Sequence, residues 1–247
     1  GVPQFDHYFR PPRFSRAEFF KSLGIPENRH LILCAPFFDT YSNSSGIKII
    51  NDLARAIDRG RLPRDSHLLV RYRPESMPED FSEEKLLRHP NITVTVPYSL
   101  PFTRKNKRPD YEFSGSDVDM LFNSIYFSEV TINTISTLTV DAIALDKPVI
   151  NIRFDGDPKT PKAYKIELYT GYDHYNFIEN AKAVRLACNM DELISQINEY
   201  LKNPQLDKEG RKMVRDAEIE FFDGLSGRRF AEFIFKELRT ESPLSVN

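Results

Sequence analysis

Short apolar runs alternate with amphipathic stretches along most of the chain. The runs hold few polar residues and occupy positions 31–38, 67–72, 92–97, 129–133, 148–153 and 183–188. An apolar run of this length without polar alternation is typical of a strand that is covered on both faces. The pattern therefore predicts a sheet that lies between layers of helices.

Segments with helical periodicity separate these predicted strands. They occupy residues 47–58, 79–88, 117–127, 137–145 and 190–202, with another helix before the first strand, at about 15–23, and two after the last, at about 207–222 and 226–239. Ser15 and Ser226 are predicted N-caps. Strands and helices that alternate in this way imply right-handed crossovers between parallel strands. We therefore predict an α/β fold with a doubly wound, mostly parallel, Rossmann-like sheet and additional C-terminal helices.

The same pattern divides the chain into three parts. Residues 1–30 form a Pro-rich entry segment and the first helix, and residues 31–205 form the Rossmann-like domain. Residues 206–247 contain the last two helices, which we expect to pack on the same domain, and a frayed tail.

The composition narrows the possible functional classes. Among 247 residues, 34 Lys and Arg against 36 Asp and Glu give a net charge of −2, so we expect no nucleic-acid partner. Cys34 and Cys188 lie in apolar runs, which predicts small buried side chains, not a disulfide, and favours a reducing cytoplasm. The longest apolar run is too short to span a bilayer. We expect a soluble cytoplasmic protein whose membrane contact, if any, is peripheral.

The loops that follow the predicted strands carry the candidate ligand-binding residues, because ligands of a parallel sheet bind beyond the carboxyl ends of its strands. The first loop ends in Ser44, Ser45 and Gly46 at a helix start, where backbone N–H groups suit a phosphate. The second contains Arg73, which the following Pro74 keeps extended, so that its guanidinium can pair with a phosphate. In both loops the alternative is an ordinary polar surface.

The third and fifth loops supply further candidates. Tyr98 can stack on a nucleobase, whereas the basic run at 104–108 is typical of a solvated face. Asp155 and His174 are candidate acid and base groups, although a histidine in a loop is more often structural. No His or third carboxylate stands at ligand spacing beside Asp155 and Asp157, so we predict neither a metal site nor a cofactor.

The fourth loop, after the run at 129–133, combines two hydroxyl groups with a carboxyl group. Ser136 and Thr137 lie where a buried strand passes into a helix, and hydroxyls and helix-terminal N–H groups there suit an anion. Asp141 follows about one turn later and can accept hydrogen bonds from the hydroxyls of a ribose or a glycerol. An anion site beside a hydrogen-bond acceptor for hydroxyl groups fits a sugar nucleotide. The alternative is a capped helix whose aspartate is merely solvated.

Together these residues resemble the C-terminal, nucleotide-binding half of a GT-B-type glycosyltransferase. The resemblance is to the bacterial surface-carbohydrate transferases, which include glycerophosphotransferases and are akin to sugar-nucleotide 2-epimerases. It rests on four segments: "DVDMLFNSIYFSEVTINTISTLTVDAIALDKPVINI", "RYRP", "DGLSGRRFAEFI" and the opening "GVPQFDHYF". In such proteins a segment like "GVPQFD" marks the hinge that enters the second Rossmann domain.

The resemblance implies where a donor would bind. The pyrophosphate would lie near Ser136 and Thr137, the ribose or glycerol on Asp141, and the base near Tyr98. The sequence departs from the family at Arg73, where a His is usual, and at Asp141, where many relatives have Glu. The first change weakens a glycerophosphotransferase assignment, and the second favours it.

The resemblance also implies an enzyme of which this chain is one part. We expect the donor-binding half of a metal-independent glycosyltransferase of surface polysaccharide synthesis, with a nucleotide-sugar donor. The glycan or lipid-linked acceptor would bind an N-terminal half that the resemblance places outside this chain. The alternatives are a sugar-nucleotide 2-epimerase-like enzyme, a CDP-glycerol-type glycerophosphotransferase and a non-catalytic Rossmann-like binding module.

Overall fold

The computed structural model describes residues 1–35, 43–71, 88–95, 114–160, 162, 165–169 and 173–240. Within them the chain forms a six-stranded parallel sheet with the strand order β3-β2-β1-β4-β5-β6. The strands are β1 (His30–Ala35), β2 (Ser66–Arg71), β3 (Ile92–Thr95), β4 (Val130–Asn133), β5 (Val149–Ile152) and β6 (Arg185–Ala187). Each predicted apolar run overlaps one of these strands, and the predicted Rossmann-like fold class is confirmed.

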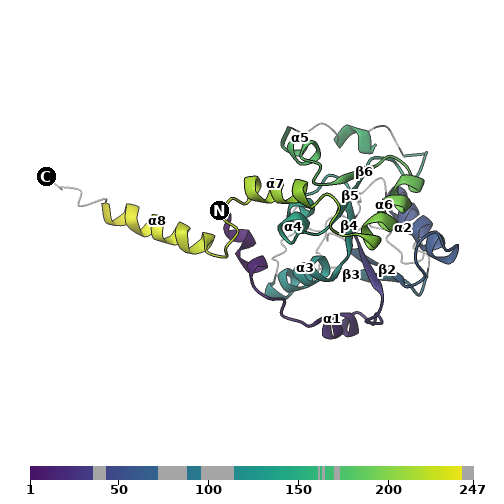
Figure 1. Cartoon of the computed structure of the whole chain (residues 1–247), viewed down its shortest axis with the longest axis horizontal. Helices are drawn as coiled ribbons and strands as arrows, with labels where there is room; N and C mark the ends of the chain where they lie inside the picture. Colours follow the sequence, from purple (N-terminus) through teal and green to yellow (C-terminus); the bar gives the residue numbers. More distant parts are fainter. Residues whose placement is uncertain are drawn as a thin grey trace, which may run out of the picture.

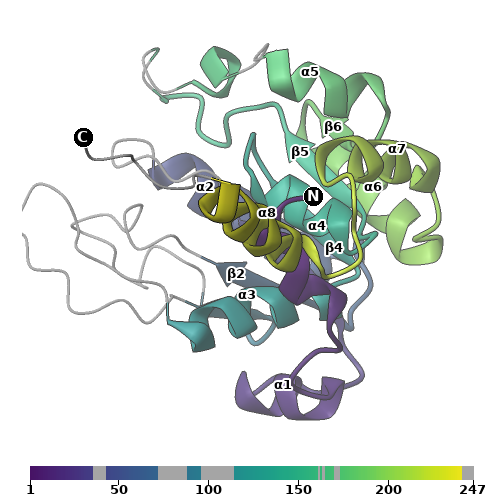
Figure 2. The same ribbon diagram turned by 90° about the vertical axis from the view of Figure 1, so that its left-hand side faces the viewer.

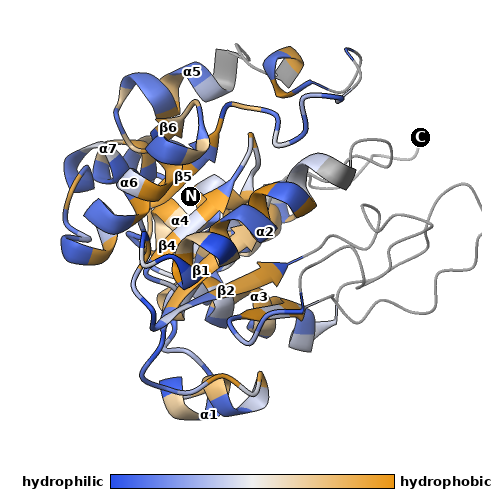
Figure 3. Cartoon of the chain, turned by 90° about the vertical axis from the view of Figure 1, so that its right-hand side faces the viewer, coloured by the Kyte–Doolittle hydropathy of each residue, from blue (hydrophilic) through white to orange (hydrophobic). Residues whose placement is uncertain are grey.

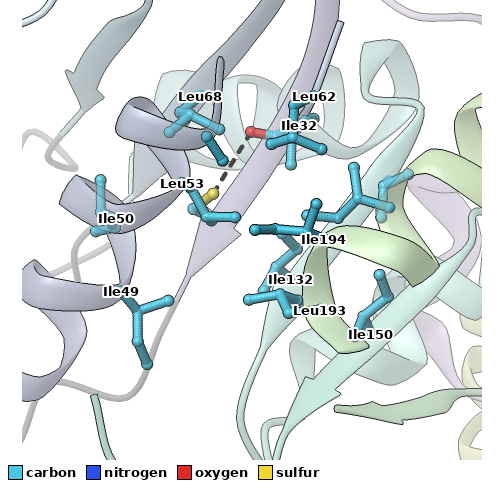
Figure 4. Close-up of a cluster of buried hydrophobic side chains, with 14 of the residues drawn as sticks. Ile32, Ile49, Ile50, Leu53, Leu62, Leu68, Ile132, Ile150, Leu193 and Ile194 are labelled. Atoms are coloured by element: carbon cyan, nitrogen blue, oxygen red, sulfur yellow. Dashed lines mark hydrogen bonds between the residues drawn. The ribbon is translucent and has the colours of Figure 1, made fainter. Parts of the chain in front are cut away.

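Helices cover both faces of the sheet (Figure 1). One face carries α2 (Asn43–Asp58) and α6 (Met190–Lys202), and the cluster between them and the strands is apolar (Figure 4). The other face packs against α1 (Arg16–Ser22), α3 (Gly115–Phe127), α4 (Leu138–Ala144), α5 (Asp173–Asn180) and α7 (Lys208–Glu218). The strands between the two layers are largely hydrophobic (Figure 3), as the apolar runs predicted.

The alternation of side chains along β1 explains the two layers. Ile32 and Cys34 belong to the cluster under α2 and α6, whereas Leu31 and Leu33 belong to the opposite cluster. Successive side chains of a strand point to opposite faces, so a strand without polar positions requires cover on both. The core therefore has two halves that share one sheet.

Local capping determines several helix starts. Ser15 accepts a hydrogen bond from the backbone N–H of Glu18, whose carboxylate accepts one from Ser15 in return. Ser114 and Asp117 form the same reciprocal capping box at α3. The N-cap predicted at Ser15 is thus confirmed, whereas the helix predicted at 79–88 falls almost entirely outside the described residues.

Three helical elements were not expected. The opening segment contains a 3-10 helix, η1 (Pro3–Phe9), and another, η4 (Ile166–Tyr169), precedes α5. α5 itself occupies residues that the sequence placed in a loop, so His174 lies at the start of a helix. Cys188 is exposed, and only Cys34 is buried as predicted for both. Cys188 comes directly after β6, where the chain leaves the sheet, so the apolar run overstated its burial.

The two C-terminal helices behave differently. α7 packs against α4, but α8 (Ser226–Thr240) contacts η1 and then extends away from the rest of the molecule (Figures 1 and 2). Its large apolar side chains are exposed: Phe230, Phe233, Ile234, Phe235 and Leu238. We expected both helices to pack on the domain, and for most of α8 the structure differs. No helix of the described residues is long and apolar enough to cross a membrane.

Candidate functional site

The order of the strands identifies the edge of the sheet at which a ligand would bind. From β1 the chain proceeds to β2 on one side, and β4 and β5 follow on the other side of β1. Open parallel sheets bind ligands where the order reverses, outside the carboxyl ends of the strands. Here that position is beyond β1 and β4, and the first residues after β4 lead into α4.

Ser136 and Thr137 form the connection between β4 and α4. The hydroxyl oxygen of Ser136 accepts a hydrogen bond from the backbone N–H of Leu138, at 3.3 Å. Thr137, the residue directly before the helix, is exposed, and its hydroxyl makes no capping bond. The expected hydroxyl pair thus lies at the helix start, with Ser136 engaged locally and Thr137 facing solvent.

Asp141 lies one turn into α4 and contacts the opening segment of the chain. The hydroxyl of Tyr8 in η1 donates a hydrogen bond to Oδ1 of Asp141, at 2.9 Å. Burial raises the pKa of Asp141 from 3.8 to about 6, although the hydrogen bond from Tyr8 favours the ionised form. Burial and the nearby carboxylate also raise the pKa of Tyr8, so the phenol remains a donor. The carboxyl group can therefore change its protonation state close to neutral pH.

A buried arginine interacts electrostatically with Tyr8. Arg71, the last residue of β2, is 8% exposed, and its Nη1 has no hydrogen-bond partner within the described ranges. Burial lowers its pKa, whereas the charges of Asp117 and Tyr8 act in the opposite direction. The guanidinium remains protonated under any ordinary condition. A fixed positive charge therefore stands at the carboxyl end of β2, close to the crevice.

A network of buried polar side chains supports the start of α4 from below. Asn151 donates to the side-chain oxygen of Asn133, and the hydroxyl of Thr139 donates to the same oxygen at 3.2 Å. Tyr175 of α5 lies 2.7 Å from the Thr139 hydroxyl and donates to Asn151 at 3.1 Å. Asn133, Thr139 and Asn151 have no exposed surface. Since every member is bonded, the network holds α4 rigidly to the ends of β4 and β5.

One of the residues predicted in the first loop, Ser45, makes a hydrogen bond within the protein. Ser45 is buried, and its hydroxyl accepts a hydrogen bond from the backbone N–H of Gly156 at 2.5 Å. Gly46 is buried at the start of α2, and the side chain of Ser44 lies outside the described part. The hydroxyl of Ser45 therefore joins the loop after β5 to α2, and its expected contact with phosphate stays a prediction.

The remaining candidates divide between structural roles and undescribed residues. Oδ1 of Asp155 accepts a hydrogen bond from the backbone N–H of Ile166 at 3.1 Å, so this carboxylate orders a loop. His174 belongs to α5, but its side chain lies outside the described part of the chain. Arg73, Tyr98 and the basic run at 104–108 also lie outside it. Among the described residues no group of three His, Cys, Asp or Glu side chains could hold a metal ion.

Sequence reasoning missed several members of this cluster. Asn133 and Asn151 are polar residues inside apolar strands, a pattern that indicates a buried hydrogen-bond network. Arg71 likewise ends an apolar strand. Tyr8 gave no local signal, because it precedes Asp141 by 133 residues. Only the folded chain places its phenol at the site.

Comparisons with known proteins bear on the fold. No family model and no curated protein matches the chain. The structure is similar to that of a variant of the wall teichoic acid polymerase TagF soaked with CDPG, with a TM-score of 0.58 and 16% identity over 99% of this chain and 51% of that one. It is also similar to the S. aureus MnaA–UDP co-structure, with a TM-score of 0.59 and 14% identity over 99% of this chain and 56% of that one.

A third similar structure is the UDP-GlcNAc 2-epimerase from Neisseria meningitidis bound to UDP-GlcNAc. Its TM-score is 0.50 at 13% identity, and the match covers 90% of this chain and 48% of that one. At such identities the likeness shows the fold alone, which is the Rossmann-like fold common to these structures. The chain spans about half the length of the proteins that it matches.

Proposed function

We propose that this chain is the donor-binding half of a GT-B-type enzyme that uses a nucleotide-linked sugar or polyol. The observation that carries the proposal is the arrangement at the start of α4, where Ser136, Thr137 and Asp141 lie within about one turn at the carboxyl edge of the sheet. The comparisons support the proposal, because the three similar structures were obtained with CDPG, UDP and UDP-GlcNAc, respectively.

Each part of this arrangement has a chemical task in the proposal. The hydroxyl of Thr137 and the backbone at the helix start bind the pyrophosphate, and Ser136 shapes the turn that presents them. Asp141 accepts a hydrogen bond from a hydroxyl of the ribose or glycerol. Charge that develops on a departing nucleoside diphosphate is then stabilised by groups already in place, without a metal ion. Arg73 and Tyr98 remain predicted contacts to phosphate and base.

The finer proposal is a metal-independent glycosyltransferase of surface polysaccharide synthesis. Since the chain spans about half of the matched structures, we propose that the acceptor and the general base belong to a further part of the enzyme. The isolated chain should then bind nucleotides with little or no turnover. A transferase rate comparable to that of a complete enzyme, from this chain by itself, would contradict this proposal.

A thermal-shift panel of UDP, CDP, CMP, GDP and dTDP tests nucleotide binding, because a ligand that binds only the native state raises the apparent stability. Affinities of the best ligand are then measured by calorimetry for Ser136→Ala/Asp141→Ala and for Ser195→Ala. Ser195 is an exposed serine on α6 and serves as the control. The double variant should bind at least about tenfold more weakly, the loss expected for one charged hydrogen bond. No stabilisation by any nucleotide, or unchanged affinity in the double variant, would refute the proposal.

An epimerase is the second candidate, favoured by the match to the Neisseria meningitidis enzyme. It would need acid and base groups in the crevice, for which His174 and Asp155 were predicted, but Asp155 is already bonded to the backbone of Ile166. Incubation of a complete protein with UDP-GlcNAc and no acceptor separates the two. A new epimer would favour this candidate, and an unchanged donor would favour transfer.

A further inference from the structure

The strongest unassigned feature is the pairing of Tyr8 with the carboxyl group of Asp141. Tyr8 is 6% exposed and its hydroxyl donates to Oδ1 at 2.9 Å. The structure records no other hydrogen bond to this carboxyl group from the described residues, and no cation pairs with it there. The carboxyl group proposed to accept a hydrogen bond from the ribose or glycerol is therefore already bonded, on one oxygen, to a side chain from η1.

The aromatic ring of Tyr8 is held firmly. Its centroid lies 4.0 Å from that of His7 and 5.4 Å from that of Phe122 on α3. Close ring contacts of this kind fix the plane of the phenol and hence the direction of its O–H bond. A ligand that displaced Tyr8 from Oδ1 would have to break this packing.

The segment that carries Tyr8 is also anchored from its other side. Oδ1 and Oδ2 of Asp6 accept hydrogen bonds from the backbone N–H groups of Ser226 and Gly227, at 3.0 and 2.7 Å. These two N–H groups begin α8 and lack partners inside their own helix. η1 thus contacts both α8 and α4, and the ring contact with Phe122 of α3 holds Tyr8 at the site.

We propose that Tyr8 is a specificity-determining residue, which occupies Oδ1 of Asp141 so that the carboxylate accepts from one ligand hydroxyl through Oδ2. A carboxylate with both oxygens open can accept from two neighbouring hydroxyls of a ribose at once. The phenol oxygen of Tyr8, 2.9 Å from Oδ1, uses one lone pair of that oxygen and fills the space beside it, so we expect a single ligand hydroxyl to bind, through Oδ2. This inference rests on the proposed function, and it adds which part of the sugar is recognised and by what means.

Deoxynucleotides test the number of hydroxyls that the site reads. Binding of UDP, 2′-deoxy-UDP and 3′-deoxy-UDP is measured by calorimetry, and the cytidine series is measured in the same way. The native chain should lose about tenfold in affinity for one deoxy analogue and little for the other, since a hydrogen bond to a charged group contributes on that order. Tyr8→Phe frees Oδ1 and should lose about tenfold for both analogues.

Tyr126→Phe is the matched control. Its ring also packs against Phe122, at 5.6 Å, but it lies on the exposed surface and makes no hydrogen bond to Asp141. This variant should keep the native ratios. Equal sensitivity of the native chain to both analogues, or to neither, overturns the inference. So do unchanged ratios in Tyr8→Phe.

A pH series tests whether the hydrogen bond of Tyr8 acts on the carboxylate that binds the ligand. Loss of the phenol removes a hydrogen bond that favours the ionised carboxylate, so the acidic limit of UDP binding should shift upward in Tyr8→Phe. Among the described residues, Arg71 of β2 interacts electrostatically with Tyr8, and Asp117 of α3 with Arg71; both are retained in the variant. An unshifted limit overturns the inference. If no nucleoside diphosphate binds the native chain, the proposed function fails and this inference fails with it.

Discussion

Tyr8 and Asp141 are separated by 133 residues, and yet the hydroxyl of Tyr8 donates a hydrogen bond of 2.9 Å to the carboxyl group of Asp141. This contact joins the opening segment of the chain to the helix that begins the candidate site. Because the carboxyl group is half-buried and pairs with no cation among the described residues, holding it ionised has a cost in stability. That cost can be measured.

Asp141→Asn should stabilise the protein at neutral pH. The pKa of Asp141 is raised from 3.8 to about 6, so the folded state disfavours the ionised form. The penalty is absent below about pH 4, grows as the pH rises towards 6 and is complete above it. Each pKa unit corresponds to about 1.4 kcal/mol, so the gain at pH 7.5 is at most about 3 kcal/mol. Urea unfolding at pH 4 and 7.5 measures it, and a gain that does not depend on pH would contradict the assignment.

Gly156→Ala should destabilise the contact between the loop after β5 and α2. A Cβ atom at Gly156 would lie 2.3 Å from the backbone oxygen of Ser45 and 2.7 Å from the side chain of Ile49. Backbone cannot yield as a flexible side chain can, so a loss of about 1–3 kcal/mol is expected. Gly115→Ala is the control, since a Cβ there meets open space. Equal unfolding midpoints for the two variants would argue against this packing.

Arg211→Ala should be strongly destabilising. Arg211 is fully buried and donates to Asp146 at 2.8 Å and to the backbone oxygens of Leu206 and Pro204. Its removal leaves these acceptors without a donor, a change that typically costs about 3–5 kcal/mol.

Lys212→Ala is the companion variant for Arg211→Ala. Lys212 is an exposed neighbour on α7 that pairs with Asp216, and exposed pairs contribute about 1 kcal/mol or less. Unfolding in guanidinium chloride should give a clearly lower midpoint for Arg211→Ala than for Lys212→Ala, and similar midpoints would refute the role of Arg211.

Asp6→Ala should release the first turn of α8. Burial alone would raise the pKa of Asp6, but hydrogen bonds from Gly227 and Ser226 lower it overall, so the carboxylate is ionised at neutral pH. Loss of an N-terminal cap costs about 1 kcal/mol. Amide hydrogen exchange should accelerate in residues 226–230 and remain unchanged in the central strands. Uniform acceleration throughout the protein would instead indicate global destabilisation.

Phe233→Ser combined with Phe235→Ser should leave the stability of the folded chain almost unchanged. Both side chains are exposed on α8, at 61% and 62%, so their removal changes stability by about 0.5 kcal/mol or less. Phe19→Ala is the contrast, because Phe19 is fully buried and should cost about 3–5 kcal/mol. A large loss in the α8 variant would mean that its apolar face is covered in solution.

The sequence was informative where structure depends on neighbours along the chain. Apolar runs located the strands because a strand covered on both faces has no polar alternation. Ser15 was recognised as a cap because a serine directly before a helical segment is a local signal. The rule that ligands bind at the carboxyl ends of strands identified Ser136, Thr137 and Asp141 together as candidate binding residues. Their role in binding stays a prediction.

The tertiary structure decided what depends on residues far apart. Ser45 and Gly156 are 111 residues apart, and only the folded chain shows that the Ser45 hydroxyl accepts a hydrogen bond from the Gly156 backbone. The separation of Tyr8 from Asp141 hides their pairing in the same way. The sequence also does not show that the pKa of Asp141 lies near 6, because that value follows from burial in the folded chain. The sequence by itself determined the six strands and most of the α-helices along the chain, because periodicity of burial is a local property. Which side chains meet at the site was decided only by folding, because hydrogen bonds and burial depend on distance in space.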